Sequence, residues 1–184
     1  MAELTFAEIS KLLKYDPETG KLFWLPRPVE MFTGGGKTSQ THIARTWNTR
    51  FAGKEAFQAD LHGYLSGRIF KTLYRAHRIA WLLHYGEWPT HQVDHINGDR
   101  SDNRLENLRD VPASDNRKNQ KLRSKNTSGS YGVHWDQSRG RWCARIGHKH
   151  LGRFDSKDEA IAVRRRAERE LGYHPNHGRS EERT

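Results

Sequence analysis

Four polar residues in the middle of the chain have the types and the spacing that hydrolysis of a phosphodiester requires. Asp94 and His95 are adjacent, Asn107 follows twelve positions after the histidine, and Asn116 follows nine positions after that. Together they supply a carboxylate, an imidazole and carboxamides, which are the groups needed for metal-assisted cleavage of a phosphodiester. The sequence therefore predicts a pocket that holds one metal ion and one phosphate.

Each of these residues suits a different task in that chemistry. Asp94 is the anionic metal ligand available, and Asn116 offers a neutral carbonyl oxygen. Oxygen ligands of this kind favour Mg²⁺ or Mn²⁺ and leave coordination positions open for phosphate oxygens and water. His95 is the candidate general base, because the ordinary pKa of histidine lies near neutrality. Asn107 is expected to bridge the loop backbone and fix the pocket.

Two short strands and a helix must position these groups. The pattern predicts a strand over 92–96, a loop opened by Asn97-Gly98, a strand over 107–111 and a helix from near Ser114. Neighbouring residues of a strand point to opposite faces. Asp94 and His95 can therefore serve one phosphate only if they approach it from two sides, or if the strand bends at its end.

The stretch VDHINGDRSDNRLENLRDVPASDNRKNQ resembles the HNH nuclease family, most closely its phage and intron-encoded homing endonucleases. The resemblance implies a ββα-metal core, the same four residue roles, dependence on Mg²⁺ or Mn²⁺, and cleavage of DNA. It also implies a protein of a phage or mobile element, located in the cytoplasm of a bacterial host. Upstream, His77-Arg78 matches a His-Arg pair of the family. We expect His77 to be packed and hydrogen-bonded rather than catalytic.

Composition points to an intracellular protein with a polyanionic partner. The chain has 184 residues, a formal net charge of +10, and only 34% hydrophobic residues, so small cores are expected rather than one large one. An excess of positive charge favours nucleic acid as the partner. The single cysteine, Cys143, excludes an internal disulfide and a multi-cysteine zinc site and fits a reducing cytoplasm. Signal-peptide and membrane-span patterns are both missing, so a soluble protein is expected.

The first part of the chain, 1–70, is expected to be a scaffold or accessory DNA-binding region. The predicted elements are a helix capped by Thr5 with Glu8, a strand over 21–24, an irregular polar stretch over 26–53, and short strands over 63–65 and 68–70. The nuclease domain follows at 71–122. A helix over 76–85 precedes the four polar residues within it.

The last part of the chain predicts a second domain. Residues 123–130 continue a basic, polar run that is expected to be a flexible linker, and 174–184 are expected to be a tail. Between them, 131–173 predict strands over 131–135, 141–146 and 149–154, then a helix opened by Ser156 with Ala160, Val163, Ala167 and Leu171 on one face. A three-stranded sheet backed by one helix, in this order, resembles the AP2 DNA-binding domain.

Alternation along the middle strand separates a helix-facing set from an outward-facing set. Trp142, Ala144 and Ile146 are expected to face the helix, and Arg141, Cys143 and Arg145 to face outward. The expected DNA contacts are Arg141, Arg145, His134 and His150 on the sheet, and Lys121, Arg123 and Lys125 in the preceding basic run. Arginines on such a face can read guanine edges in a major groove.

These expectations combine into one hypothesis. The fold class is α+β, with a ββα-metal HNH core and an AP2-like sheet of three antiparallel strands with one packed helix. The expected function is site-specific, metal-dependent DNA cleavage that nicks one strand as a monomer on double-stranded DNA. A non-catalytic DNA-binding regulator, a dimer that cuts both strands, and a protein that binds or cuts RNA remain the alternatives.

Overall fold

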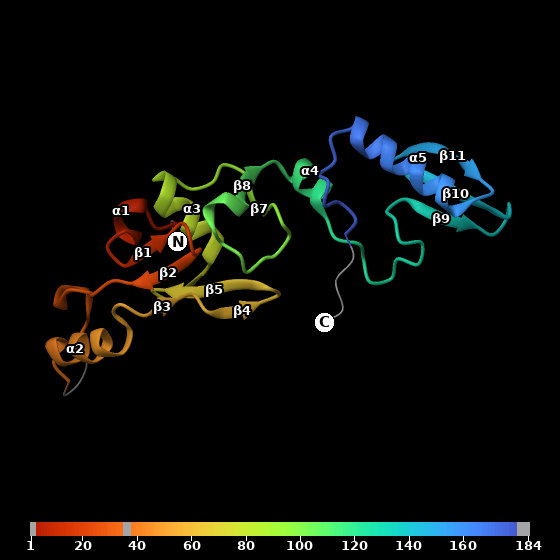
Figure 1. Ribbon diagram of the computed structural model, residues 1–184. Coiled ribbons are helices and arrows are strands. Elements are labelled where there is room, and N and C mark those ends of the chain that lie inside the picture. The colour runs from red at the N-terminus through yellow and green to blue at the C-terminus, as the bar shows by residue number, and fades with distance from the viewer. Residues whose placement is uncertain (1–2, 35–37, 180–184) are drawn as a thin grey trace. The chain divides into compact units, whose positions relative to one another are not determined.

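A computed structural model describes residues 3–34 and 38–179, which form two compact units, Met1–Asp110 and Val111–Thr184 (Figure 1). The expected nuclease segment, 71–122, spans the division between the units. Residues 180–184 of the expected tail lie outside the described part of the chain. In the described part, no helix is long and apolar enough to cross a membrane.

The first unit begins with a short helix and a small antiparallel sheet. α1 (Phe6–Ile9) starts at a complete capping box in which Thr5 and Glu8 satisfy each other's backbone amides, as the sequence predicts. The strands β1 (Leu13–Asp16), β2 (Lys21–Trp24) and β3 (Glu55–Ala56) follow, with β2 in the middle.

The stretch predicted to be irregular, 26–53, contains a 12-residue helix, so that prediction is wrong. After η1 (Val29–Met31), the helix α2 (Gln40–Phe51) starts at Ser39, whose side chain accepts a hydrogen bond from the amide of His42. Ala44 is the one helix residue buried in the described structure. Ile43, Trp47 and Phe51 recur every four residues, which is a helical spacing, although most other residues of the helix are polar.

A second sheet consists of β4 (Ala59–Leu61), β5 (Tyr64–Ile69) and β6 (Thr72–Arg75), with β5 central. β5 replaces the two predicted short strands, because Gly67 continues the strand instead of turning it. A Cβ atom at Gly67 would lie 2.7 Å from the ring of Phe57. This glycine therefore allows close packing of the Phe57 ring on the strand.

Helix α3 (Ala76–Tyr85) joins the two sheets in one core and is followed by the hairpin of the candidate site. α3 ends at Gly86, which adopts a left-handed conformation with φ of 82°. The core combines residues of the first 70 positions with residues of α3: Ile9, Leu12, Leu13, Leu22, Ile69, Ile79 and Leu82. Residues of the first segment therefore pack against the helix that precedes the site. The hairpin strands are β7 (Gln92–His95) and β8 (Leu108–Val111), with η2 (Leu105–Asn107) before β8.

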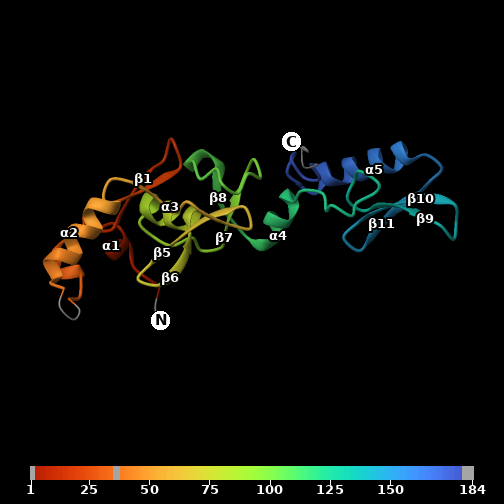
Figure 2. The ribbon, with the colours of Figure 1, turned by 90° about the horizontal axis from the view of Figure 1, so that it is seen from below.

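The second unit is built on a three-stranded antiparallel sheet packed against one helix (Figure 2). It opens with α4 (Ala113–Asn116) and η3 (Arg117–Asn119). The strands β9 (Val133–Asp136), β10 (Arg141–Ile146) and β11 (Lys149–Phe154) precede α5 (Lys157–Glu170), which is capped by Ser156. These elements agree with the predicted strands and helix to within two residues at each end. The agreement concerns the elements and does not test the AP2 resemblance.

The apolar face of α5 differs from the predicted one at its end. Ala160 is fully buried against Val133 and Ala144. Leu171 lies beyond the helix and is 53% exposed, so its prediction as part of the apolar helix face is wrong. Arg164 is buried on α5 instead, where its guanidinium donates to the Arg145 carbonyl and to Glu168.

The basic run before β9 makes local hydrogen bonds, and the chain after α5 lies beside its start. Ser128 is buried, and its hydroxyl donates to the carbonyl of Ser130. The amide of Leu122 donates to the carbonyl of Arg179, and that of Gly178 donates to the carbonyl of Gln120. Residues 174–179 are therefore part of the fold of the second unit.

Candidate active site

The β7–β8 hairpin is held against α3 by a small apolar cluster. Val93 of β7 and Leu108 of β8 pack on Ala80 of α3, and Tyr15 and Trp81 cover this contact. Asp94 and His95 come directly after Val93, and both are buried, with 9% and 4% of their surfaces exposed. Packing of the hairpin thus removes two strongly polar side chains from bulk water, which happens when each has polar partners.

The loop that joins the strands is braced by the amide side chain of Asn107. Its Oδ1 accepts a hydrogen bond from the Asn97 amide at 2.9 Å, and its Nδ2 donates to the Asp102 carbonyl at 2.8 Å. The two bonds span the loop from its first residue to a point near its end. Asn107 therefore shapes the loop that passes beside His95, and it sits at the end of η2 immediately before β8.

The strand bends where His95 ends it. The amide of Gly98 donates to the His95 carbonyl, and Gly98 has φ of 75°, a left-handed conformation that favours glycine. The chain therefore turns immediately after the Asp94–His95 pair. This bend at Asn97-Gly98 is the second of the two geometries that the sequence leaves open.

His95 is positioned by a buried asparagine and two aromatic neighbours. Its Nε2 lies 3.1 Å from Oδ1 of Asn103, whose side chain is itself buried. The rings of His77 and Tyr64 lie 5.1 Å and 5.9 Å from the His95 ring, between centroids. Burial lowers the pKa of His95 below its ordinary value, and the Asn103 contact and nearby carboxylates oppose this shift. A neutral imidazole, which can accept a proton, is therefore favoured at neutral pH.

His77 is packed as expected, but one of its hydrogen bonds is missing. Its Nδ1 is buried with no hydrogen-bond partner among the described residues. Burial, with the neighbouring charges of His95, Arg78 and Arg75, lowers its pKa to about 3. His77 is thus a neutral side chain whose edge contacts the ring of His95.

Asp94 already has a cationic partner. Its Oδ2 accepts hydrogen bonds from Nε and Nη2 of Arg109 at 3.0 and 2.7 Å. Arg109 lies on β8, so the ion pair joins the two strands of the hairpin. The guanidinium therefore partly neutralises the carboxylate, and a metal ion bound by Asp94 would compete with Arg109 for it.

The proposed second metal ligand, Asn116, belongs to the second unit, where it is the last residue of α4. Asp94, His95 and Asn107 belong to the first unit, where they lie on or immediately before the strands of the β7–β8 hairpin. Across residues 3–34 and 38–179, no group of three or more histidine, cysteine, aspartate and glutamate side chains is arranged to hold a metal. The proposed site has one carboxylate and an amide oxygen as protein ligands, so it does not need such a group of three.

The sequence does not reveal the residues that contact His95 and Asp94 and hold them in place. Asn103 is one of several polar residues of the loop, yet its side chain contacts the candidate base. Arg109 is one of several arginines near the motif, yet it forms an ion pair with Asp94. Tyr64 gives no signal, because its contact with His95 comes from β5, about 30 residues earlier. Side chains alternate along β8, so Arg109 should point to the face opposite the buried Leu108. This is the sequence signal that could have drawn attention to Arg109.

The expected DNA-contacting residues of the second unit are all exposed: His134, His150, Arg141, Arg145, Lys121, Arg123 and Lys125. Arg141 forms an ion pair with Asp155 at 3.0 Å. Cys143 is predicted to face outward but is buried, with 4% of its surface exposed. Its register partners on the neighbouring strands are His134 and Arg153, whose longer side chains can cover it. Arg153, missed in the sequence, adds an exposed arginine to this row.

Comparison with known proteins identifies the class of domain that contains Asp94 and His95. Residues 74–118 match the family model described as HNH endonuclease, and this range includes Asp94, His95, Asn107 and Asn116. The chain therefore contains an HNH endonuclease domain. It is 33% identical over 113 residues to Protein 3.8 of Escherichia phage T7, an alignment that covers 56% of this chain and 92% of that protein. The chain belongs to the same family as Protein 3.8. No solved structure gives a significant match to it.

Proposed function

We propose that this protein is a metal-dependent DNA endonuclease of the homing type, which nicks one strand of duplex DNA as a monomer. The observation that carries the proposal is the buried His95, held by Asn103 next to Asp94, within the range that matches the HNH endonuclease model. The related phage protein supports a phage or mobile element as the genetic context.

The residues present suit a hard divalent cation. We propose Asp94 and Asn116 as its protein ligands, because a carboxylate and an amide carbonyl match the oxygen preference of Mg²⁺ or Mn²⁺. Binding of the cation would require Asp94 to share its carboxylate between the metal and Arg109, or to release the arginine. When bound, the metal would neutralise the phosphate and stabilise the charge that develops on the leaving oxygen.

His95 would act as general base toward the attacking water. With Asn103 Oδ1 as acceptor, Nε2 of His95 carries its proton and Nδ1 retains a lone pair. Lowering of the His95 pKa by burial keeps the ring in this neutral form. Asn107 contributes by holding the loop, and it need not touch the substrate.

The second unit would hold the duplex through the exposed face of its sheet. Residues 111–184 contain 17 of the 32 lysines and arginines but only 9 of the 22 acidic residues, which places +8 of the +10 formal charge there. This concentration of charge favours a backbone-binding role, because phosphate contacts supply most of the affinity of proteins for DNA. One active site per chain would cut one strand per binding event.

Relaxation of a supercoiled plasmid tests the proposal. Open circles should appear with Mg²⁺, and neither a chelator-treated sample nor the His95→Ala variant should produce them. The matched control is His91→Ala, which removes a half-exposed histidine just outside β7 and should leave cleavage intact. Linear plasmid that forms as fast as open circles would show that a dimer cuts both strands. Tight DNA binding without any cleavage would favour the regulator.

The ligand assignment has its own test. Asp94→Ala and Asn116→Ala should raise the Mg²⁺ concentration needed for half-maximal cleavage, and DNA affinity measured in chelator should stay the same. Normal cleavage by both variants at low Mg²⁺ would mean that the metal is held elsewhere.

A further inference from the structure

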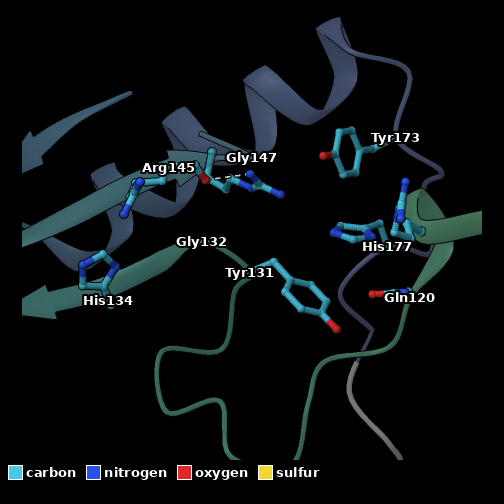
Figure 3. A pocket seen from close by; sticks show the side chains of 10 residues that line it. Gln120, Tyr131, Gly132, His134, Arg145, Gly147, Tyr173 and His177 are labelled. Carbon is cyan, nitrogen blue, oxygen red and sulfur yellow. Dashed lines mark hydrogen bonds between the residues drawn. The ribbon is translucent and has the colours of Figure 1, made fainter. Parts of the chain in front are cut away.

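The second unit contains a cavity of about 430 Å³ beside the sheet, lined by β-strand ends, α5 and the segment after α5 (Figure 3). Its described lining includes the three arginines Arg117, Arg145 and Arg164 and the histidines His134 and His177, and it has no aspartate or glutamate. A cavity with basic walls and no acidic lining residue selects for an anion.

His177 provides an independent sign that the cavity takes a ligand. Its side chain is only 6% exposed, and neither ring nitrogen has a hydrogen-bond partner among the described residues. The ring is held in place by Tyr131, which stacks on it at 4.8 Å, and by Tyr173, which contacts it edge-on. Buried polar groups are nearly always hydrogen-bonded, so an orphaned imidazole in a cavity wall indicates a missing partner.

The nearest protein acceptors do not supply that partner. Oε1 of Glu168 lies 3.7 Å from Nε2 of His177, beyond hydrogen-bond distance, and it already accepts from Nε of Arg164 at 2.8 Å. The backbone of Lys118 also lies near the ring and opposes the lowering of the His177 pKa by burial, but neither ring nitrogen forms a hydrogen bond of normal distance and angle with it. His177 therefore has hydrogen-bonding capacity that the described residues do not satisfy.

The arginines of the cavity differ in how firmly they are held. Arg164 is fixed by Glu168, and its Nη1 also donates to the Arg145 carbonyl. Arg117 and Arg145 form no ion pair within the described structure. Their charges are therefore available to a bound anion.

The cavity opens beside the face proposed to meet DNA. His134 of β9 and Arg145 of β10 line it, and both are exposed residues of that outer sheet face. Gly132 forms part of the same wall and packs closely against the backbone of Arg145. A Cβ atom at Gly132 would lie 2.2 Å from the Arg145 carbonyl oxygen. The wall is thus set by tight backbone packing, and an anion in the cavity would lie next to the sheet.

We propose that this cavity binds one backbone phosphate of the duplex that lies on the β9–β11 sheet, with Arg117 and Arg145 supplying charge and His177 a hydrogen bond. The inference rests on the proposed DNA-binding role of the second unit. It adds an anchoring site that fixes where the duplex backbone leaves the sheet, in line with the general use of phosphate contacts to set the register of a protein on DNA.

The test measures duplex affinity of the full chain in chelator over a range of salt concentrations. Arg117→Gln should weaken binding and lower the slope of log K against log salt by about 1. His177→Phe keeps an aromatic ring between the tyrosines but removes both nitrogens, and it should also weaken binding. Arg166→Gln is the control, because Arg166 is a 78% exposed arginine of α5 outside the cavity.

The outcomes separate this inference from the proposal on which it rests. If the wild type binds duplex DNA and both cavity variants match Arg166→Gln, the phosphate site is wrong and DNA binding stands. If the wild type does not bind duplex DNA, the DNA-binding role fails and the phosphate site fails with it. Because Arg117 is exposed, its substitution does not threaten folding, so weaker binding by that variant cannot be attributed to unfolding.

Discussion

At the scale of single residues, Asn103 is the contact that distinguishes an oriented histidine from a merely buried one. We predict that Asn103→Ala lowers the turnover number of cleavage by about 10–100-fold, because the His95 ring loses the acceptor that fixes its tautomer and orientation. DNA affinity should not change. The measurement is single-turnover cleavage with the metal and the protein at saturating concentrations.

A matched substitution separates positioning from folding. Asn103→Asp retains an oxygen acceptor for Nε2 of His95 and should recover part of the rate lost in Asn103→Ala. Equal rates for both variants and the wild type would show that the contact has no role in catalysis. Equal loss in both, together with a lowered free energy of unfolding, would assign Asn103 a structural role only.

His77 leads to a prediction on stability rather than on catalysis. Its pKa is about 3 in the folded protein against an ordinary value of 6.5, so below pH 6.5 the unfolded chain binds a proton that the folded chain does not. Stability is therefore full above pH 6.5 and is lost as the pH falls toward 3, at up to about 1.4 kcal/mol per pH unit.

Urea unfolding at pH 7 and pH 5 tests this for wild type and His77→Phe. The variant cannot take up the proton, so its free energy of unfolding should fall less between the two pH values. His84→Phe is the control, since His84 is exposed and close to the end of the same helix. A pH dependence of His77→Phe as steep as that of the wild type would contradict the prediction.

The residues of the site are predictable to different degrees. Asp94, His95 and Asn107 can be found because their types and spacing indicate a chemistry. Asn103 cannot be singled out, because the loop also carries Asn97, Asp99 and Asp102, and only the folded turn decides which side chain points inward. Alternation predicts which face of the sheet carries Cys143. It does not predict that the side chain is buried there beneath the longer side chains of its neighbours.

At the scale of elements, the tip of the β1–β2 hairpin supports the loop of the site. Gly20 has φ of 74°, and a Cβ atom there would lie 2.5 Å from the backbone nitrogen of Arg104. The Leu105 amide donates to the carbonyl of Pro17, and the Tyr15 hydroxyl donates to that of Asn103. The hairpin thus fixes the backbone of the residue that holds His95.

We predict that Gly20→Ala destabilises the protein and slows cleavage, because the added methyl group forces the hairpin away from the loop. Gly53→Ala is a matched control, since Gly53 has φ of 77° but no atom within 4 Å of the position that an added methyl group would take. Both variants should lose about 1 kcal/mol to backbone strain. Gly20→Ala should lose about 1–3 kcal/mol more from the clash. Equal losses of stability and equal cleavage rates would contradict this support role.

Elements are predictable where apolar residues recur with the period of the helix or strand that forms. β10, β11 and α5 combine alternating strands with a capped helix, and all three appear close to their predicted positions. α2 is missed because most of its residues are polar, although Ser39 offers a capping signal and Ile43, Trp47 and Phe51 have helical spacing. The sequence predicts two short strands in place of β5, because a serine-glycine pair usually marks a turn. In the structure Gly67 continues the strand and makes room for the Phe57 ring.

At the scale of the whole molecule, charge is distributed unevenly between the two units. The first unit carries the HNH hairpin and a nearly balanced set of charges, and the second carries +8 of the formal charge of +10. Affinity and chemistry are therefore expected to depend on different parts of the chain. Substitutions in the hairpin should change the rate of cleavage, and substitutions in the second unit should change how tightly DNA is held.

Salt dependence gives this division a quantitative test. If the chain makes about 6–10 phosphate contacts, its affinity for duplex DNA should fall by about 10³–10⁵ between 50 and 200 mM salt. Replacing Arg145 and Lys149 by glutamine should lower the slope of log K against log salt by about 2. The same change at Lys11 and Lys14, two exposed lysines of the first unit, should leave the slope unchanged. Equal effects of the two double variants would show that DNA is held by both units alike, and a flat plot for the wild type would remove DNA binding from the proposal.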